Sequence, residues 1–194
     1  SRDFGKASLF AYYPRLSFDP VYLKRAETYA KSRSNVGIRG IPRILSTGKY
    51  EAIFYVVFEK TSGRTIEHFC SSGRYLYGVD IVQFLIASVG MLCELIPHSL
   101  NHGFITPETV VFDSHSEPYL TMFGIFRDET LTKSDFDPFL TDARDLCRVA
   151  LYSMTAKLLP EQLRTYERII GSDVIPLPGD KGMTDAIYRV LVKG

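Results

Sequence analysis

The sequence lacks two features that would point directly to a function. Its net charge is only +1 at pH 7, which argues against wholesale electrostatic binding to nucleic acid or an anionic membrane. Its three cysteines are too few and too widely spaced for the clustered ligands of a structural zinc site. We therefore expect free, buried thiols and a reducing, intracellular location, in the cytoplasm or the nucleus.

We also expect no hydrophobic run long enough to cross a membrane. The most apolar stretch, residues 81–96, contains Gln83 and Glu94 and is shorter than the roughly 20 residues that a span needs. Hydrophobic residues make up 45% of the 194-residue chain, enough for a core. We expect 81–96 to be a core helix and predict no membrane partner.

What the sequence does contain is a series of helix and strand signals. Asp19 followed by Pro20 predicts a helix start. The β-branched and aromatic residues of 51–60 predict a buried strand, after a Gly- and Pro-rich connector at 35–45. The other expected elements are a strand within 7–18, short strands at 109–113 and 118–123, and helices near 65–70, from Gly78 to Ile96, from Asp142, at 160–170 and at 183–192.

The segment 98–124 resembles the catalytic region of a protein kinase. In that family a long helix leads to H-R-D-L-x-x-x-N, a strand pair follows, and D-F-G comes next. Here residues 102–109 read HGFITPET and residues 122–124 read MFG, in the same hydrophobic frame. The resemblance implies an α+β, protein-kinase-like fold with two lobes. A reduced, β-containing small lobe is expected at 1–60 and a trimmed, mostly helical large lobe at 61–194.

The positions that carry chemistry in the family hold different residues here. The resemblance places Phe104 at the catalytic aspartate, Thr106 at the loop lysine, Thr109 at the metal-binding asparagine, Met122 at the metal-binding aspartate and Tyr13 at the phosphate-binding lysine. Phosphoryl transfer depends on these groups, and a thioether is a poor ligand for magnesium. No G-x-G-x-x-G occurs. We expect a degenerate, catalytically inactive member, a pseudokinase, that binds neither ATP nor magnesium nor another cofactor.

Other residues match positions that build the kinase fold. The resemblance implies that His102 and Phe123 belong to a hydrophobic column between the lobes and that Gly124 completes the second motif. It also implies that Asp145 anchors the loop by accepting backbone N–H bonds from residues 102–104. We therefore interpret the loop as a structural corner.

A basic stretch at residues 24–43 has only one acid, Glu27, against six cations: Lys24, Arg25, Lys31, Arg33, Arg39 and Arg43. We interpret it mainly as a solvated helix face, with an acidic protein or RNA as alternative ligands. The favoured function is a protein-interaction scaffold or a regulatory, allosteric subunit of a larger assembly. The alternatives are a nucleotide-binding sensor or unorthodox phosphotransferase, and an RNA-contacting subunit that uses residues 24–43.

Overall fold

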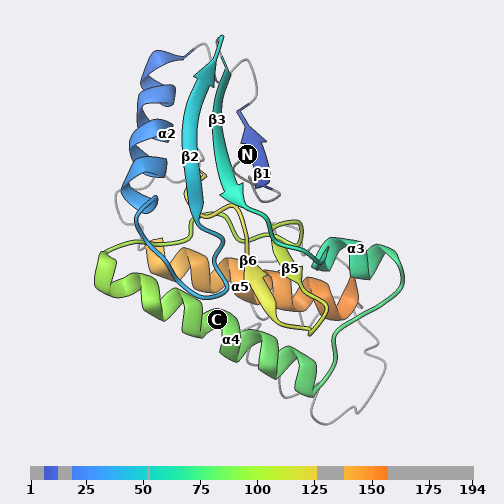
Figure 1. Cartoon of the computed structure of the whole chain (residues 1–194). Helices are drawn as coiled ribbons and strands as arrows, with labels where there is room; N and C mark the ends of the chain where they lie inside the picture. The colour runs from blue at the N-terminus through green and yellow to red at the C-terminus, as the bar shows by residue number, and fades with distance from the viewer. Residues whose placement is uncertain (1–6, 13–18, 52, 126–137, 157–194) are drawn as a thin grey trace.

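The computed structural model describes residues 7–12, 19–51, 53–125 and 138–156 (Figure 1). The predictions made for Tyr13, for most of the irregular stretch 126–140 and for helices at 160–170 and 183–192 lie outside these ranges. The described elements form a three-stranded sheet with one helix before residue 60, and a helical part with a second three-stranded sheet after it. The predicted α+β class is confirmed.

The first sheet has the order β1-β3-β2, with both neighbouring pairs antiparallel. Its strands are β1 (Ala7–Ala11), β2 (Ile44–Tyr50) and β3 (Ile53–Glu59). β3 lies in the centre, and its alternate residues Phe54, Val56 and Phe58 are buried. This period of two is what a strand with one core face requires.

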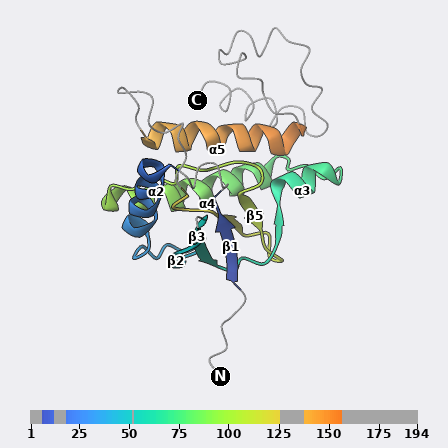
Figure 2. The ribbon, with the colours of Figure 1, turned by 90° about the horizontal axis from the view of Figure 1, so that it is seen from above.

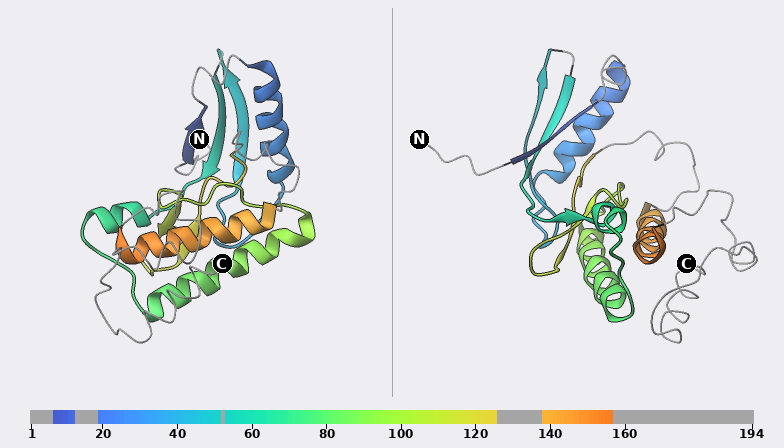
Figure 3. Two further views of the ribbon diagram at one scale, coloured as in Figure 1. Left: turned by 180° about the vertical axis from the view of Figure 1, so that it is seen from behind. Right: turned by 90° about the vertical axis from the view of Figure 1, so that its right-hand side faces the viewer.

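Helix α2 (Pro20–Arg33) packs on one face of this sheet, as the right-hand view of Figure 3 shows. The Asp19 carboxylate accepts hydrogen bonds from the N–H groups of Val21 at 2.8 Å and Tyr22 at 3.2 Å. Pro20 takes the first helical position, where a missing N–H costs nothing. The predicted helix start is confirmed.

In its described residues, the second part of the chain combines a small sheet with three helices. The sheet has the order β4-β5-β6, all antiparallel, and its strands are β4 (Arg64–Thr65), β5 (Val110–Phe112) and β6 (Pro118–Leu120). The helices are α3 (Ile66–Ser71), α4 (Val79–Leu95), extended by the 3-10 turn η1 (Ile96–His98), and α5 (Pro138–Thr155). α4 and α5 lie side by side (Figures 2 and 3).

Helix α4 has two apolar faces. Ile81, Phe84, Met91 and Leu95 are buried in the core with residues of α5. A second row is exposed in the described part of the chain: Val79, Val82, Ile86, Val89 and Ile96. Together with η1 the helix reaches 20 residues with mean hydropathy 1.9, so by length and composition alone it could span a membrane. The expectation that this run is too short was wrong, although its inner face packs as a core helix does.

The three cysteines are free, as expected, but they are not all buried. Cys70 is buried, and loss of hydration raises the pKa of its thiol to about 11. Cys147 is half-buried, and burial raises its pKa as well. Cys93 is exposed on α4, so the expectation of buried thiols was wrong for this residue.

Candidate functional site

The loop 102–109 follows α4 and η1 and is anchored from below by a carboxylate on α5. Asp142 is 2% exposed, and its two oxygens accept the backbone N–H groups of His102 and, at 2.8 Å, Gly103. Burial raises the pKa of Asp142 to about 6, while these two hydrogen bonds act in the opposite direction. The carboxylate therefore fixes the backbone at the start of the loop.

The anchor is Asp142 and not Asp145, which corrects the expectation drawn from the kinase motif. The third N–H of the turn, that of Phe104, is donated to His102 Nδ1 at 3.3 Å. Asp145 instead contacts Arg148, one turn further along α5, at 3.3 Å. Residues three positions apart on a helix lie about 60° apart around its axis and about 4.5 Å apart along it, so helix position decides which carboxylate reaches the loop.

His102 is completely buried beneath the loop. Its Nδ1 accepts the Phe104 N–H, which leaves the proton on Nε2, 3.3 Å from the carbonyl oxygen of Leu120. Burial is the main reason that its pKa falls to about 4. The imidazole is therefore neutral at physiological pH, and its ring lies 5.8 Å from that of Phe123. This side chain ties the loop to β6 and to residues 122–124.

A hydroxyl group closes the other end of the loop. Thr109 is 4% exposed; its Oγ accepts the Thr106 N–H at 2.8 Å and contacts the carbonyl oxygen of Phe104 at 2.9 Å. Its backbone carbonyl accepts the Thr121 hydroxyl at 2.7 Å. The polar atoms of Thr109 are thus used inside the protein, so this hydroxyl is not displayed to a ligand.

Phe104 and Met122 both pack against an apolar cluster formed by residues of the first sheet and α2. That cluster includes Tyr12, Tyr22 and Phe54, which come from β1's end, α2 and β3. The Tyr12 ring lies 5.4 Å from Phe54 and 6.0 Å from Tyr22. Tyr13, the neighbouring residue that the motif places at the lysine position, is outside the described residues. The described side chains here form a predominantly apolar contact between the two parts of the chain.

The turn 122–124 has an unusual backbone. Met122 has φ +66°, in the left-handed region that few residues other than glycine adopt. Gly124 has φ +90°, and a Cβ there would lie 2.6 Å from Ile44 Cδ1. The Ile125 N–H donates to the Met122 carbonyl at 3.1 Å and closes the turn. A larger residue at 124 would be strained at this φ and would require the Ile44 side chain to shift.

The predicted basic stretch is not one surface. Arg33 is 5% exposed, and its guanidinium lies 3.4 Å above the Tyr29 ring. It donates to the carbonyl and side-chain oxygens of Asn101 at 3.3 and 3.1 Å. Burial also lowers the pKa of Arg33. Because this side chain is buried and hydrogen-bonded to Asn101, it connects α2 to the segment before the loop and does not belong to a surface patch. Its inclusion in the patch was wrong.

The other five predicted cations are exposed but belong to two groups. Lys24, Arg25 and Lys31 are on α2, where Lys31 pairs with Glu27 at 2.8 Å. Arg39 and Arg43 lie on the connection from α2 to β2, and Arg43 pairs with Glu59 at 3.4 Å. The spacing Tyr22, Ala26, Ala30, Arg33 follows the helix period and marks Arg33 as inward-facing, a signal that was visible in the sequence.

Solved structures with this arrangement are kinase domains. A crystal structure of the PknI kinase domain from Mycobacterium tuberculosis superposes with a TM-score of 0.73 at 15% identity, covering 96% of this chain and 74% of that chain. A point mutant of the same domain gives a TM-score of 0.71 at 16% identity, over 82% and 68% of the two chains. The chain has a protein-kinase-like fold.

Sequence comparisons alone do not detect this likeness. No protein-family model matches the chain, and no curated protein matches it. We refer to the sheet of β1–β3 with α2 as the small lobe and to the elements from β4 onward as the large lobe. The loop 102–109 and the turn 122–124 lie between them, since Phe104 and Met122 pack on the small-lobe cluster and Phe123 on the large-lobe core.

Proposed function

We propose that this chain is a catalytically inactive kinase-like domain, a pseudokinase, that acts as a protein-interaction scaffold or an allosteric subunit of a larger intracellular assembly. The observation that carries the proposal is the packing of Phe104 and Met122 against the apolar small-lobe cluster. At these positions the kinase motif holds the two aspartates that orient the acceptor hydroxyl and bind magnesium. Two apolar side chains stand there instead and join the lobes.

The hydrogen bonds of the loop support the same proposal. The motif places a metal-binding asparagine at Thr109, and the hydroxyl of this threonine is engaged with Thr106 and Phe104. Catalysis of phosphoryl transfer relies on positioned charges and metal ions rather than on covalent chemistry by the protein. The Thr109 hydroxyl is uncharged and bonded within the loop, so it does not replace the metal-binding group of the motif. What the loop supplies is a rigid connection between lobes.

Nucleotide binding provides the first test. A ligand that binds only the folded state raises the thermal midpoint of unfolding. Because we expect the chain not to bind nucleotide, we expect no rise at millimolar ATP, with or without magnesium. An active protein kinase measured in the same buffer is the positive control. A magnesium-dependent rise, together with ATP hydrolysis that a Phe104 substitution abolishes, would overturn the proposal in favour of a sensor or unorthodox enzyme.

The absence of tryptophan from the chain allows a site-specific version of this test. Phe104→Trp places a single fluorophore between the lobes, and Tyr119→Trp places one on β6, away from that contact. We expect neither emission spectrum to change on addition of ATP and magnesium. A change in the Phe104→Trp variant alone would locate a nucleotide between the lobes and contradict the proposal. Equal changes in both would indicate a global effect of the nucleotide and equally contradict it.

A further inference from the structure

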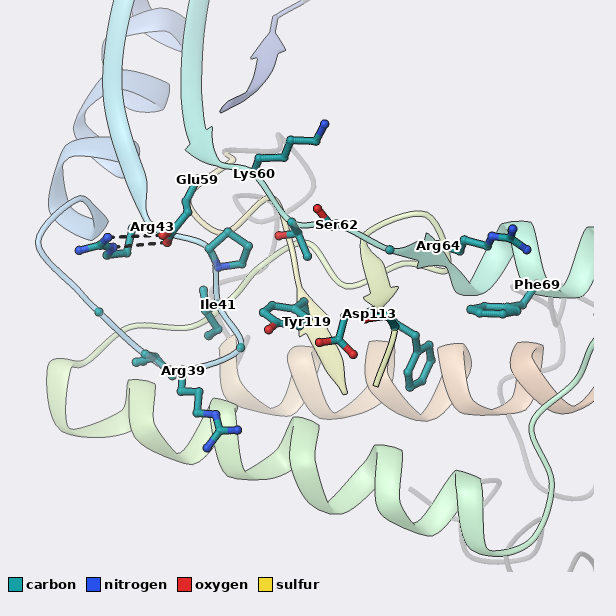
Figure 4. Close-up of a pocket in the computed structure, with 18 of the residues that line it drawn as sticks. Arg39, Ile41, Arg43, Glu59, Lys60, Ser62, Arg64, Phe69, Asp113 and Tyr119 are labelled. Carbon is teal, nitrogen blue, oxygen red and sulfur yellow. Dashed lines mark hydrogen bonds and ion pairs between the residues drawn. The ribbon is translucent and has the colours of Figure 1, made fainter. Parts of the chain in front are cut away.

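A large groove lies beside the segment that joins the two lobes, outside the contact of Phe104 and Met122 (Figure 4). It has a volume of about 900 Å³ and is bordered by residues 37–43, 59–64, 112–114, Phe69, Arg74 and Tyr119. We call it the hinge groove. Four stretches form it: the connection from α2 to β2, the segment between β3 and β4, α3 with Arg74 after it, and the hairpin of β5 and β6. The kinase motifs include none of these residues.

The hinge groove has apolar residues at its centre and cations at its edge. Figure 4 shows Ile41 and Tyr119 in the middle, with Arg39, Lys60 and Arg64 around them. Ile41 is 5% exposed, whereas these three cations are exposed. An apolar floor with a charged rim is the usual composition of a surface that binds a protein segment.

The charges of the groove are unbalanced. Its two carboxylates are already engaged: Glu59 pairs with Arg43 at 3.4 Å, and Asp113 accepts the N–H groups of His115 and Glu117 at 2.8 and 3.0 Å. Within the described ranges, no carboxylate pairs with the remaining cations, which are Arg39, Lys60, Arg64 and Arg74. The whole chain has a net charge of only +1, so this excess is local. A ligand with several negative charges would complement it.

The aromatic side chains favour a peptide over a nucleic acid. Single-stranded nucleic acid needs open ring faces on which its bases stack. Here Phe112 is 7% exposed and is covered by the rings of Phe69 at 6.1 Å and Phe84 at 5.8 Å. Phe112 therefore offers a base little open ring face, whereas the apolar residues that line the groove suit an aliphatic side chain inserted from an acidic segment.

The backbone beside the groove can also take part. In the described residues, no hydrogen bond is made by the backbone of Lys60, Thr61 or Ser62, which follow the last residue of β3. An extended peptide that lies along an unpaired backbone gains main-chain hydrogen bonds independent of its sequence. Nucleic acid offers no equivalent pairing. The groove therefore combines three means of holding an extended acidic segment.

We propose that the hinge groove binds an extended, acidic segment of a partner protein, with an aliphatic side chain of that segment on the floor formed by Ile41 and Phe112. The inference rests on the proposed function as an interaction module and gives the chemistry of its partner. Arg39, Lys60, Arg64 and Arg74 bind the carboxylates of the segment. Arg43 stays paired with Glu59 and shapes one wall.

The test uses the full chain and a fluorescently labelled twelve-residue peptide of Asp and Glu with one central Leu. We expect saturable binding by fluorescence anisotropy. The double variant Arg39→Glu with Arg64→Glu should weaken it by at least tenfold, whereas the matched variant Lys24→Glu with Arg25→Glu on α2 should change it by less than twofold. Replacing the peptide Leu by Ser should weaken binding several-fold, because the apolar contact is lost. Circular dichroism checks that each variant folds.

Several outcomes would overturn the inference. Equal loss in the two double variants would show attraction by net charge without a site. Tighter binding of a twelve-nucleotide RNA, abolished by the same groove variant, would make the groove a nucleic-acid site. Self-association of the chain that the groove variant abolishes, with no peptide binding, would make the partner a second copy. Saturable binding of a Lys-containing peptide of equal length would contradict the charge argument.

The inference and the proposed function fail in different ways. A chain that binds the acidic peptide in the groove and also shows a magnesium-dependent shift with ATP retains the groove but is not an inactive domain. A chain that binds neither ATP nor the peptide retains the inactive domain but loses the groove. The Tyr119→Trp variant reports the peptide directly, since Tyr119 lines the groove, and the Phe104→Trp variant should stay unchanged.

Discussion

The loop 102–109 and the hinge groove are both rich in polar atoms, yet they use them differently. In the loop, the N–H groups of His102, Gly103 and Phe104 and the hydroxyl of Thr109 all have partners inside the protein. In the groove, the four cations Arg39, Lys60, Arg64 and Arg74 have no carboxylate partner in the described residues.

This difference separates groups that hold the fold from groups that are free to meet a ligand. A buried polar atom must be paired, and its partner then fixes the geometry around it. An exposed cation is solvated by water, so it can exchange water for a ligand at small cost. Substitutions in the loop should therefore act on stability, and substitutions in the groove on binding.

The largest effect on this comparison is expected from the loop anchor. Asp142→Ala leaves two buried N–H groups without an acceptor, and we expect it to lower the free energy of unfolding by about 3 kcal/mol. Asp145→Ala, which removes a contact with Arg148 near the surface, should cost within about 1 kcal/mol. Urea denaturation of both variants measures the difference. Equal losses would show that the loop is not held by Asp142.

The second effect concerns the pH dependence contributed by His102. Its pKa is about 4 in the folded state, below its ordinary value of 6.5, so the stability that it contributes is complete above pH 6.5 and is lost as the pH falls toward 4. His102→Asn removes this dependence. We expect the stability difference between the native chain and the variant to shrink by about 3 kcal/mol from pH 7 to pH 4.

The comparison with a variant isolates His102 from its neighbour Asp142. The raised pKa of Asp142, about 6, has the opposite effect, since its folded state gains protons before the unfolded state does and becomes relatively more stable as the pH falls from 6. Asp142 is present in both proteins, so its contribution cancels to first order. A constant difference for His102→Asn would refute the buried, neutral imidazole.

The smallest effect separates two arginines of the same basic stretch. Arg33→Met loses the hydrogen bonds to Asn101 and should lower the free energy of unfolding by about 2 kcal/mol, the usual value for hydrogen bonds of a charged group. Arg39→Met should change it by no more than about 0.5 kcal/mol, because the side chain is exposed. Thermal or urea unfolding measures both. In the peptide-binding assay the order should reverse, with Arg39→Met weakening binding and a folded Arg33→Met leaving it unchanged.

Local signals in the sequence gave reliable predictions where one short segment decides the structure. Asp19 and Pro20 begin α2 because the cap and the proline act within the first turn. The end of α4 near Pro97 and the strand pair around 110–120 were also predicted. β2 was missed because Ser46, Thr47 and Lys49 are polar and only its first residue, Ile44, is buried. Its pairing with β3 supplies what its own sequence does not.

The residues that were misassigned depend on distant contacts. α5 begins at Pro138, four residues before the predicted start, and its register turns Asp142 rather than Asp145 toward the loop. The hinge groove was not predicted at all, since its cations come from stretches at 39–43, 60–64 and 74 that have no common pattern in the sequence. Only the fold brings them together.

The uneven exposure of the three thiols also determines where the chain meets oxidants and alkylating reagents. Burial raises the pKa of Cys70 and of Cys147, so the reactive thiolate form of each is scarce at neutral pH. Cys93 is the exposed thiol of the three, on the outer side of α4, and it lines neither the loop nor the hinge groove. The chain thus carries a natural attachment point for a dye or a tether, on a helix whose modification leaves both regions compared above untouched.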